Sequence, residues 1–156
     1  MRSTEWKRIL CPVDFSGASR VAMKAAAELA ARFGAELTLF HAYPLPGYTL
    51  PEGTILPSSA SLQELARETE EHLSAWKVEA ELAGAGRVAV AQAVGEPAGE
   101  IVAFARSGAF DLVVVGTHGR TGLSHVLLGS VAERVVRRSP CPVLTFRPSA
   151  GKPETD

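Results

Sequence analysis

Short apolar runs recur along the chain. Between them lie segments in which apolar residues repeat with the period of an α-helix. The run DLVVVG (111–116) is apolar and β-branched, which is typical of a parallel strand covered on both faces. Four further strands are predicted at KRILCPV, ELTLFHAY, RVAVAQAV and PVLTF. Five strands that alternate with helices predict an α/β domain, an open doubly wound five-stranded parallel sheet with helices on both faces.

The helical segments between these strands carry start signals. Ser16 is predicted as the N-cap of the first helix, and Ser61 begins a capping box, SLQE, that is predicted to open the second. Pro97 suits the first turn of the third helix, and the fourth is predicted to open at Ser130. The inward face of the first helix is predicted to hold Ala18, Val21, Ala22, Ala25, Leu29 and Phe33.

Two segments, residues 44–58 and the C-terminal tail, fall outside the alternation of strands and helices. Residues 44–58, PLPGYTLPEGTILPS, hold four prolines and two glycines, so an irregular loop is predicted there. A mobile surface excursion is the favoured reading of this loop, and a lid over a ligand is the alternative. A single domain is predicted over 1–148, followed by a disordered tail at 149–156.

Composition narrows the classes of partner and compartment. A formal net charge of −1 gives no overall field that favours nucleic acid or an anionic membrane, so neither partner is predicted. No apolar run approaches the ~18 residues of a membrane span, and the N-terminal run is too short for a signal peptide. Cys11 and Cys141 lack metal-ligand spacing and are predicted as free thiols. We expect a cytoplasmic protein.

The segment GTHGRTGLSHVLLGS lies between the central strand and the fourth helix. Ligands of open α/β sheets bind at the carboxyl ends of the strands, and helix N-termini attract anions. Gly116 and Gly119 are expected to let a phosphate or ribose come close, and Gly129 to turn the chain with its N–H open to a phosphate oxygen. In the structural alternative, the glycines only end the strand and allow turns. Ser130 then forms a capping box with Glu133, which satisfies the N–H groups at the start of the helix within the protein.

Several common site motifs are absent from the sequence. No lysine precedes Ser130, so the Walker A pattern fails, and G-x-G-x-x-G does not occur. A Ser/His/Asp hydrolase is not favoured, because there is no G-x-S-x-G elbow. No metal site is predicted, because no ligand cluster forms around the four histidines, which are His41, His72, His118 and His125.

The pattern that remains is G-x2-G-x9-G-S, from Gly116 to Ser130. Together with five further segments, this pattern resembles the universal stress protein family, in its ATP-binding branch, over residues 5–147. The segments are ILCPVDFS, LTLFHAY, VGEPAGEIVAFA, DLVVVGTHGRTGLSHVLLGSVAERVV and PCPVL. The resemblance implies an adenine nucleotide alpha hydrolase-like fold with strand order 3-2-1-4-5. It also implies ATP, with Mg²⁺, between the first and fourth strands, and a homodimer through the last strand (142–146).

The resemblance further implies which residues bind the nucleotide. Asp14 is implied as an acceptor for base or ribose, and capping of the first helix is its alternative role. Ala42 is implied to touch the adenine. Arg120 is implied as a cation for the phosphates, and a solvated loop charge is its alternative. The implied set is Pro12, Val13, Asp14, Ala42, Val115, Gly116, Thr117, His118, Gly119, Arg120, Gly129, Ser130 and Val131.

The favoured interpretation is a non-enzymatic, ATP-binding regulatory or stress-survival module that acts as a homodimer, with an unidentified protein partner. The alternative is a slow ATPase or phosphotransferase that uses the same pocket. Fast phosphoryl transfer requires a positioned base and fixed cations, and only Asp14 and Arg120 are candidates, so no catalytic residue is predicted. A third hypothesis is an interaction protein whose glycine loop binds nothing.

Overall fold

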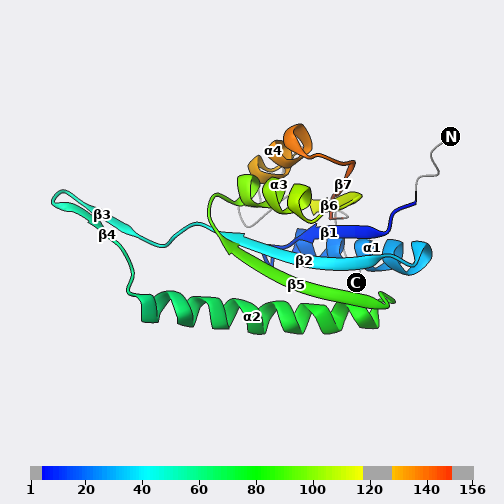
Figure 1. The fold of residues 1–156 in the computed structure, drawn as a ribbon, viewed down its shortest axis with the longest axis horizontal. Helices are drawn as coiled ribbons and strands as arrows, with labels where there is room; N and C mark the ends of the chain where they lie inside the picture. The colour runs from blue at the N-terminus through cyan, green and yellow to red at the C-terminus, as the bar shows by residue number, and fades with distance from the viewer. Residues whose placement is uncertain (1–4, 118–127, 149–156) are drawn as a thin grey trace, which may run out of the picture.

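The computed structural model describes residues 5–117 and 128–148, without the side chain of Tyr48. Its main sheet has five parallel strands in the order β5-β2-β1-β6-β7 (Figure 1). Two further strands, β3 and β4, lie outside this sheet. When the five strands of the main sheet are numbered in chain order, their order in the sheet is the expected 3-2-1-4-5. The strands of the sheet are β1 (Arg8–Pro12), β2 (Glu36–Tyr43), β5 (Arg87–Val94), β6 (Leu112–Gly116) and β7 (Val143–Phe146).

Helices cover both faces of the sheet, which confirms the doubly wound α/β prediction. The helices are α1 (Gly17–Phe33), α2 (Ser59–Leu82), α3 (Pro97–Ser107) and α4 (Ser130–Arg138). Because side chains alternate along a strand, Ile9 and Cys11 of β1 pack into the core under α1 and α2, whereas Leu10 packs under α3 and α4. The sheet therefore separates two apolar cores.

The first helix begins as predicted but turns a different face inward. The Ser16 hydroxyl accepts from the Ser19 N–H at 3.2 Å, which confirms the N-cap. The predicted inward positions Val21 and Phe33 are wrong, since 38% and 46% of these residues are exposed. Small side chains let α1 lie close against the sheet, and its buried positions are Ala18, Ser19, Ala22, Met23, Ala26, Ala27 and Ala30.

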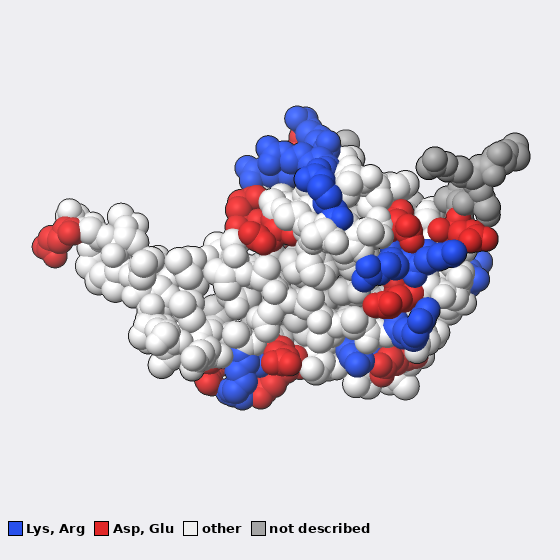
Figure 2. Space-filling view, in the orientation of Figure 1, with Lys and Arg blue, Asp and Glu red and all other residues white. Residues whose placement is uncertain are grey.

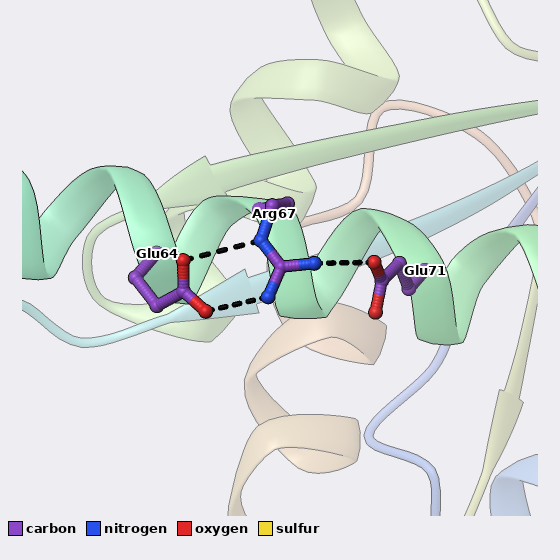
Figure 3. A network of polar contacts seen from close by, with 3 residues as sticks. All are labelled: Glu64, Arg67 and Glu71. Carbon is purple, nitrogen blue, oxygen red and sulfur yellow. Dashed lines mark hydrogen bonds and ion pairs between the residues drawn. The ribbon is translucent and has the colours of Figure 1, made fainter.

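The second helix begins earlier than predicted, and the capping box at Ser61 as its start is wrong, because the observed N-cap lies three residues before Ser61. Ser58 is its N-cap and accepts from the Ser61 N–H at 3.2 Å. On its outer face, Arg67 lies between Glu64 and Glu71 and forms ion pairs with both (Figure 3). The hydrogen bond and charge of Arg67 lower the pKa of the Glu64 carboxyl. Such i, i+3 and i, i+4 pairs suit a solvated helix face.

The prediction of an irregular loop at 44–58 is wrong. Strands β3 (Tyr48–Leu50) and β4 (Gly53–Ile55) form an antiparallel hairpin within it. The prolines lie outside these strands: Pro51 is in the two-residue turn, and the other three flank the hairpin. This hairpin arm (residues 44–58) extends away from the sheet and does not lie over it as a lid would (Figure 1).

Charge is distributed in small groups on the face shown in Figure 2. Basic side chains lie over α4, whose last turn carries Arg137 and Arg138. The hairpin arm is uncharged apart from Glu52 in its turn. Among the described residues, no helix combines the length and apolarity that crossing a bilayer requires.

The last residue of β6 lies directly against the backbone of α1. A Cβ built on Gly116 would be 2.6 Å from the carbonyl oxygen of Ala18 and 3.0 Å from the backbone nitrogen of Ser19. These backbone atoms cannot move aside as a flexible side chain would. The missing side chain at Gly116 therefore allows close packing of α1 on the sheet, whereas the sequence had suggested room for a ligand.

We expect Gly116→Ala to lower the free energy of unfolding by about 1–3 kcal/mol, because the added methyl group overpacks this contact. Urea denaturation measures the change. Gly17→Ala is the matched control, since nothing lies within 4 Å of a Cβ at Gly17. The control should change stability by less than ~0.5 kcal/mol. Equal stability of the two variants would contradict the packing role.

Candidate functional site

A cavity of about 240 Å³ opens at the carboxyl ends of β1 and β6. Ten of the residues implied by the resemblance line it: Pro12, Val13, Asp14, Ala42, Val115, Gly116, Thr117, Gly129, Ser130 and Val131. His118, Gly119 and Arg120 lie outside the described residues. Because β1 and β6 are neighbours in the sheet, residues about 100 positions apart in sequence meet at one rim.

Six further residues line the cavity and were not expected from the sequence: Ser16, Ser19, Phe40, Pro97, Ile101 and Ala132. Two patterns could have found some of them. Phe40 precedes Ala42 by two positions on β2, so strand alternation puts both on the same face. Pro97 and Ile101 are four residues apart on α3, so they share one helix face.

Asp14 is held in the turn between β1 and α1. Its Oδ1 accepts from the Ser16 N–H at 3.0 Å, and its own N–H donates to the Ser19 hydroxyl at 3.3 Å. Ser16 is the N-cap of α1, and Asp14 accepts from the N–H of this N-cap residue. Asp14 therefore lies both beside the start of α1 and in the cavity lining.

Gly129 is bound differently from the expectation. Its N–H donates to the Thr117 carbonyl at 2.6 Å, so the prediction that this donor is open to a phosphate is wrong. Its φ of −66° is accessible to any residue, so the turn does not require glycine. What Gly129 provides at the cavity wall is the absence of a side chain.

Among the described residues, no side chain caps the first turn of the helix that follows Gly129. Gly129 is the N-cap of α4 and forms no side-chain capping bond, so the capping box of Ser130 with Glu133 is not formed. Glu133 instead pairs with Arg137 at 2.7 Å. The N–H groups of the first turn have no acceptors within a helix. The positive end of the α4 dipole therefore faces the cavity.

Thr117 contributes a buried hydroxyl with no partner among the described residues. Its N–H donates to the Phe146 carbonyl at 2.9 Å, and its carbonyl accepts from Gly129. The residue is only 3% exposed, yet its Oγ1 forms no hydrogen bond to any other residue that the structure describes. A buried polar atom without a partner costs free energy, so this hydroxyl favours a ligand that can bond to it.

The side walls of the site are joined by a salt bridge next to the cavity. Glu96 caps α3 by accepting from the N–H groups of Ala98 and Gly99, and it pairs with Arg134 of α4 at 3.1 Å. The Gly99 N–H contributes most to lowering the pKa of the Glu96 carboxyl, which the positive charge of Arg134 lowers further. This carboxylate therefore links the two helices whose first turns line the cavity.

The described lining is otherwise almost uncharged. Asp14 is its one carboxylate, and it includes no lysine, arginine or histidine. No group of three or more His, Cys, Asp or Glu side chains with metal-binding geometry occurs in 5–117 and 128–148. Both cysteines are free thiols, as predicted. Burial raises the pKa of the Cys11 thiol, which favours its role in the core.

Comparison with known proteins gives the same family along most of the chain. The family model described as the universal stress protein family matches residues 5–147. Universal stress protein MJ0531 of Methanocaldococcus jannaschii is 40% identical over 144 residues, which cover 91% of this chain and 82% of the relative. A universal stress protein of Thermus aquaticus is 37% identical over 147 residues, which cover 91% of this chain and 99% of the relative.

Solved structures share the fold. The universal stress protein UspA from Lactobacillus plantarum superimposes with a TM-score of 0.78 at 26% identity, over 92% of this chain and 99% of its own. A universal stress protein solved in complex with cAMP gives a TM-score of 0.71 at 26% identity, over 91% of this chain and 97% of its own. With a family match over nearly its whole length, this chain belongs to the universal stress protein family.

Proposed function

We propose that the cavity binds an adenine nucleotide, ATP with Mg²⁺, and that nucleotide occupancy regulates a stress-survival activity. The observation that carries the proposal is the buried hydroxyl of Thr117, which has no partner among the described residues and lies beside the N-terminus of α4. A polar atom of this kind, next to helix donors and a lining whose one described charge is Asp14, matches a ligand with many acceptor oxygens.

Different lining residues suit different parts of a nucleotide. Phe40, Ala42 and Ile101 form an apolar wall for the base. Asp14 provides a carboxylate that accepts from the base or the ribose hydroxyls. Ser130 and Val131 present the first turn of α4 to the phosphates.

The size of the cavity fits part of the nucleotide. Its volume of about 240 Å³ lies just below the ~300–1,000 Å³ typical of small-molecule sites. We infer that it encloses the nucleoside and that the phosphates extend along the open side toward α4. Mg²⁺ would bind mainly to phosphate oxygens, because Asp14 is the one carboxylate in the described lining.

Nucleotide binding by a related protein supports the proposal. The universal stress protein that was solved in complex with cAMP shares 26% of its sequence with this chain and the same fold. An adenine nucleotide is therefore a ligand class found with this architecture. Both cysteines are free, which suits the reducing cytoplasm in which we place the module.

We expect ATP with Mg²⁺ at a hundred times its dissociation constant to add about 2.7 kcal/mol of stability. For a chain of 156 residues, this corresponds to a rise in melting temperature of roughly 5–10 °C. Gly129→Leu should abolish the rise, because the side chain fills the cavity wall while φ stays allowed. ADP, AMP and cAMP in parallel define specificity.

A regulatory module and a slow ATPase differ in what happens to the bound nucleotide. For the module, ATP that copurifies with the protein stays uncleaved. Turnover of ATP well above that of Gly129→Leu would instead favour the enzyme. No melting shift with any of these nucleotides would leave the interaction protein as the better description.

Replacement of Thr117 by valine should have opposite effects on the free and bound protein. In the free protein, Thr117→Val removes a buried hydroxyl that has no partner among the described residues, so we expect the free energy of unfolding to rise by about 1 kcal/mol. Nucleotide affinity should fall roughly tenfold, because a hydrogen bond to the ligand is lost. Urea denaturation and isothermal titration calorimetry measure the two effects, and unchanged affinity would contradict the role of this hydroxyl.

We also propose a homodimer formed by the outer edge of β7. The Pro142 carbonyl accepts from Val113 of β6 at 3.0 Å, and the Phe146 carbonyl accepts from Thr117, which follows β6, at 2.9 Å. By the alternation of a parallel strand, the backbone groups of Val143 and Thr145 then point to the outer edge. β7 is the last strand of the sheet, so a second copy of β7 can pair with these groups.

Thr145→Pro should convert the dimer to a monomer, because proline removes an outward N–H and leaves the bonds to β6 in place. Thr145→Val is the control, since it retains the N–H and the β-branched shape. Light scattering after size exclusion at micromolar concentration gives the mass. A dimeric proline variant would place the interface elsewhere, and a monomeric wild type would remove the dimer.

A further inference from the structure

Phe15 has a strained backbone in the turn that holds Asp14. Its φ is 64°, in the left-handed region that a bulky side chain rarely adopts. Its ring packs at centroid distances of 4.8 Å on His41 and 5.3 Å on both His72 and Trp76. Strain of this kind persists only when surrounding contacts impose it, and here the aromatic contacts with β2 and α2 do so.

His41 also holds the turn through its backbone. Its Nδ1 lies 2.7 Å from the carbonyl oxygen of Val13, and Nδ1 must be the donor because a carbonyl can only accept. The neighbouring residue on β2, Ala42, lines the cavity. Since successive side chains of a strand point to opposite faces, His41 bonds to the turn from the face of the sheet opposite the cavity.

These contacts fix the residues on both sides of Asp14. Val13 is fixed by His41 and by its N–H bond to the Phe40 carbonyl at 2.8 Å, and Phe15 is fixed by its ring. With its neighbours immobilised, the Asp14 carboxylate is left in the orientation that lines the cavity. Of the residues that support it, His41 and Phe15 lie outside the cavity lining.

We propose that Phe15 and His41 are positioning residues. From the face of the sheet opposite the cavity, they hold the Asp14 carboxylate ready for a ligand. The role in ligand binding rests on the proposed nucleotide function. The positioning itself is a property of the protein without ligand. The two parts are therefore tested by separate measurements.

The first experiment compares two His41 variants without nucleotide. His41→Asn retains an N–H donor near the position of Nδ1, whereas His41→Leu removes it, and both remove the imidazole ring. Hydrogen exchange of the Ser16 amide, which bonds to Asp14, reports the orientation of the carboxylate. The Ala35 amide, which bonds to Ala30 at the far end of α1, reports general loss of stability.

We expect His41→Leu to accelerate exchange of the Ser16 amide roughly fivefold relative to Ala35, and His41→Asn to restore most of the protection. Tyr43→Phe is a matched control on the same strand, since it removes only a hydroxyl that donates to Gln92. It should leave Ser16 unchanged. Equal exchange at Ser16 in the leucine variant and the wild type would overturn the positioning role of His41.

The second experiment measures ATP affinity by calorimetry in the same variants. We expect His41→Leu to weaken binding roughly tenfold and His41→Asn to weaken it less, with Tyr43→Phe at the wild-type value. Equal losses in the two His41 variants would mean that ring packing, and not the bond to Val13, supports the site. If the wild type binds no adenine nucleotide, the proposed function fails, and the Ser16 exchange still decides the positioning.

A pair of Phe15 variants separates strain from contact. Phe15→Gly and Phe15→Ala both lose the aromatic contacts, but only glycine adopts a positive φ without strain. We expect the glycine variant to melt at the higher temperature and both variants to lose protection at Ser16. Wild-type protection in both would show that the ring does not hold Asp14 and would overturn the role of Phe15.

Discussion

The contact between the bare end of β6 and the first turn of α1 determines where the rest of the rim lies. With no side chain at Gly116, the helix backbone comes within van der Waals distance of the strand. The turn that precedes α1 lies close to the end of β6, and Asp14 in this turn lines the cavity beside β6. The Thr117 backbone then bonds to Phe146 of β7 on one side and to Gly129 on the other. One close approach thus organises three strands and two helices around the cavity.

The resulting site is made mainly of backbone and short side chains. Charge is kept beside the cavity, where Glu96 and Arg134 join α3 to α4. For the nucleotide that we propose, such a lining offers dipoles and N–H groups to the phosphates. The described lining holds no lysine or arginine that would carry a desolvation penalty, whereas the Thr117 hydroxyl, without a partner among the described residues, is a local cost.

Much of this arrangement could be predicted, and the failures have physical causes. Periodicity predicted each strand of the main sheet but not its neighbours, so the order came from the family resemblance. The ten implied residues that line the cavity came from the family resemblance, and they lie near the carboxyl ends of β1, β2 and β6 and at the start of α4. The Gly129 N–H was misassigned because its acceptor is twelve positions earlier in the chain. The face of α1 was misread because alanines, which carry little hydrophobic signal, form most of the contact. The hairpin is not predicted because prolines usually interrupt strands, whereas these prolines lie in its turn and on its flanks.

The hairpin arm makes its regular contacts within itself, between β3 and β4. It leaves the body after β2 and returns at the start of α2, and no strand of the main sheet pairs with it. Its sequence and length are therefore independent of core packing. The arm marks a point where segments can be inserted, deleted or grafted, so that related proteins can acquire different outer surfaces while the parallel sheet remains the same.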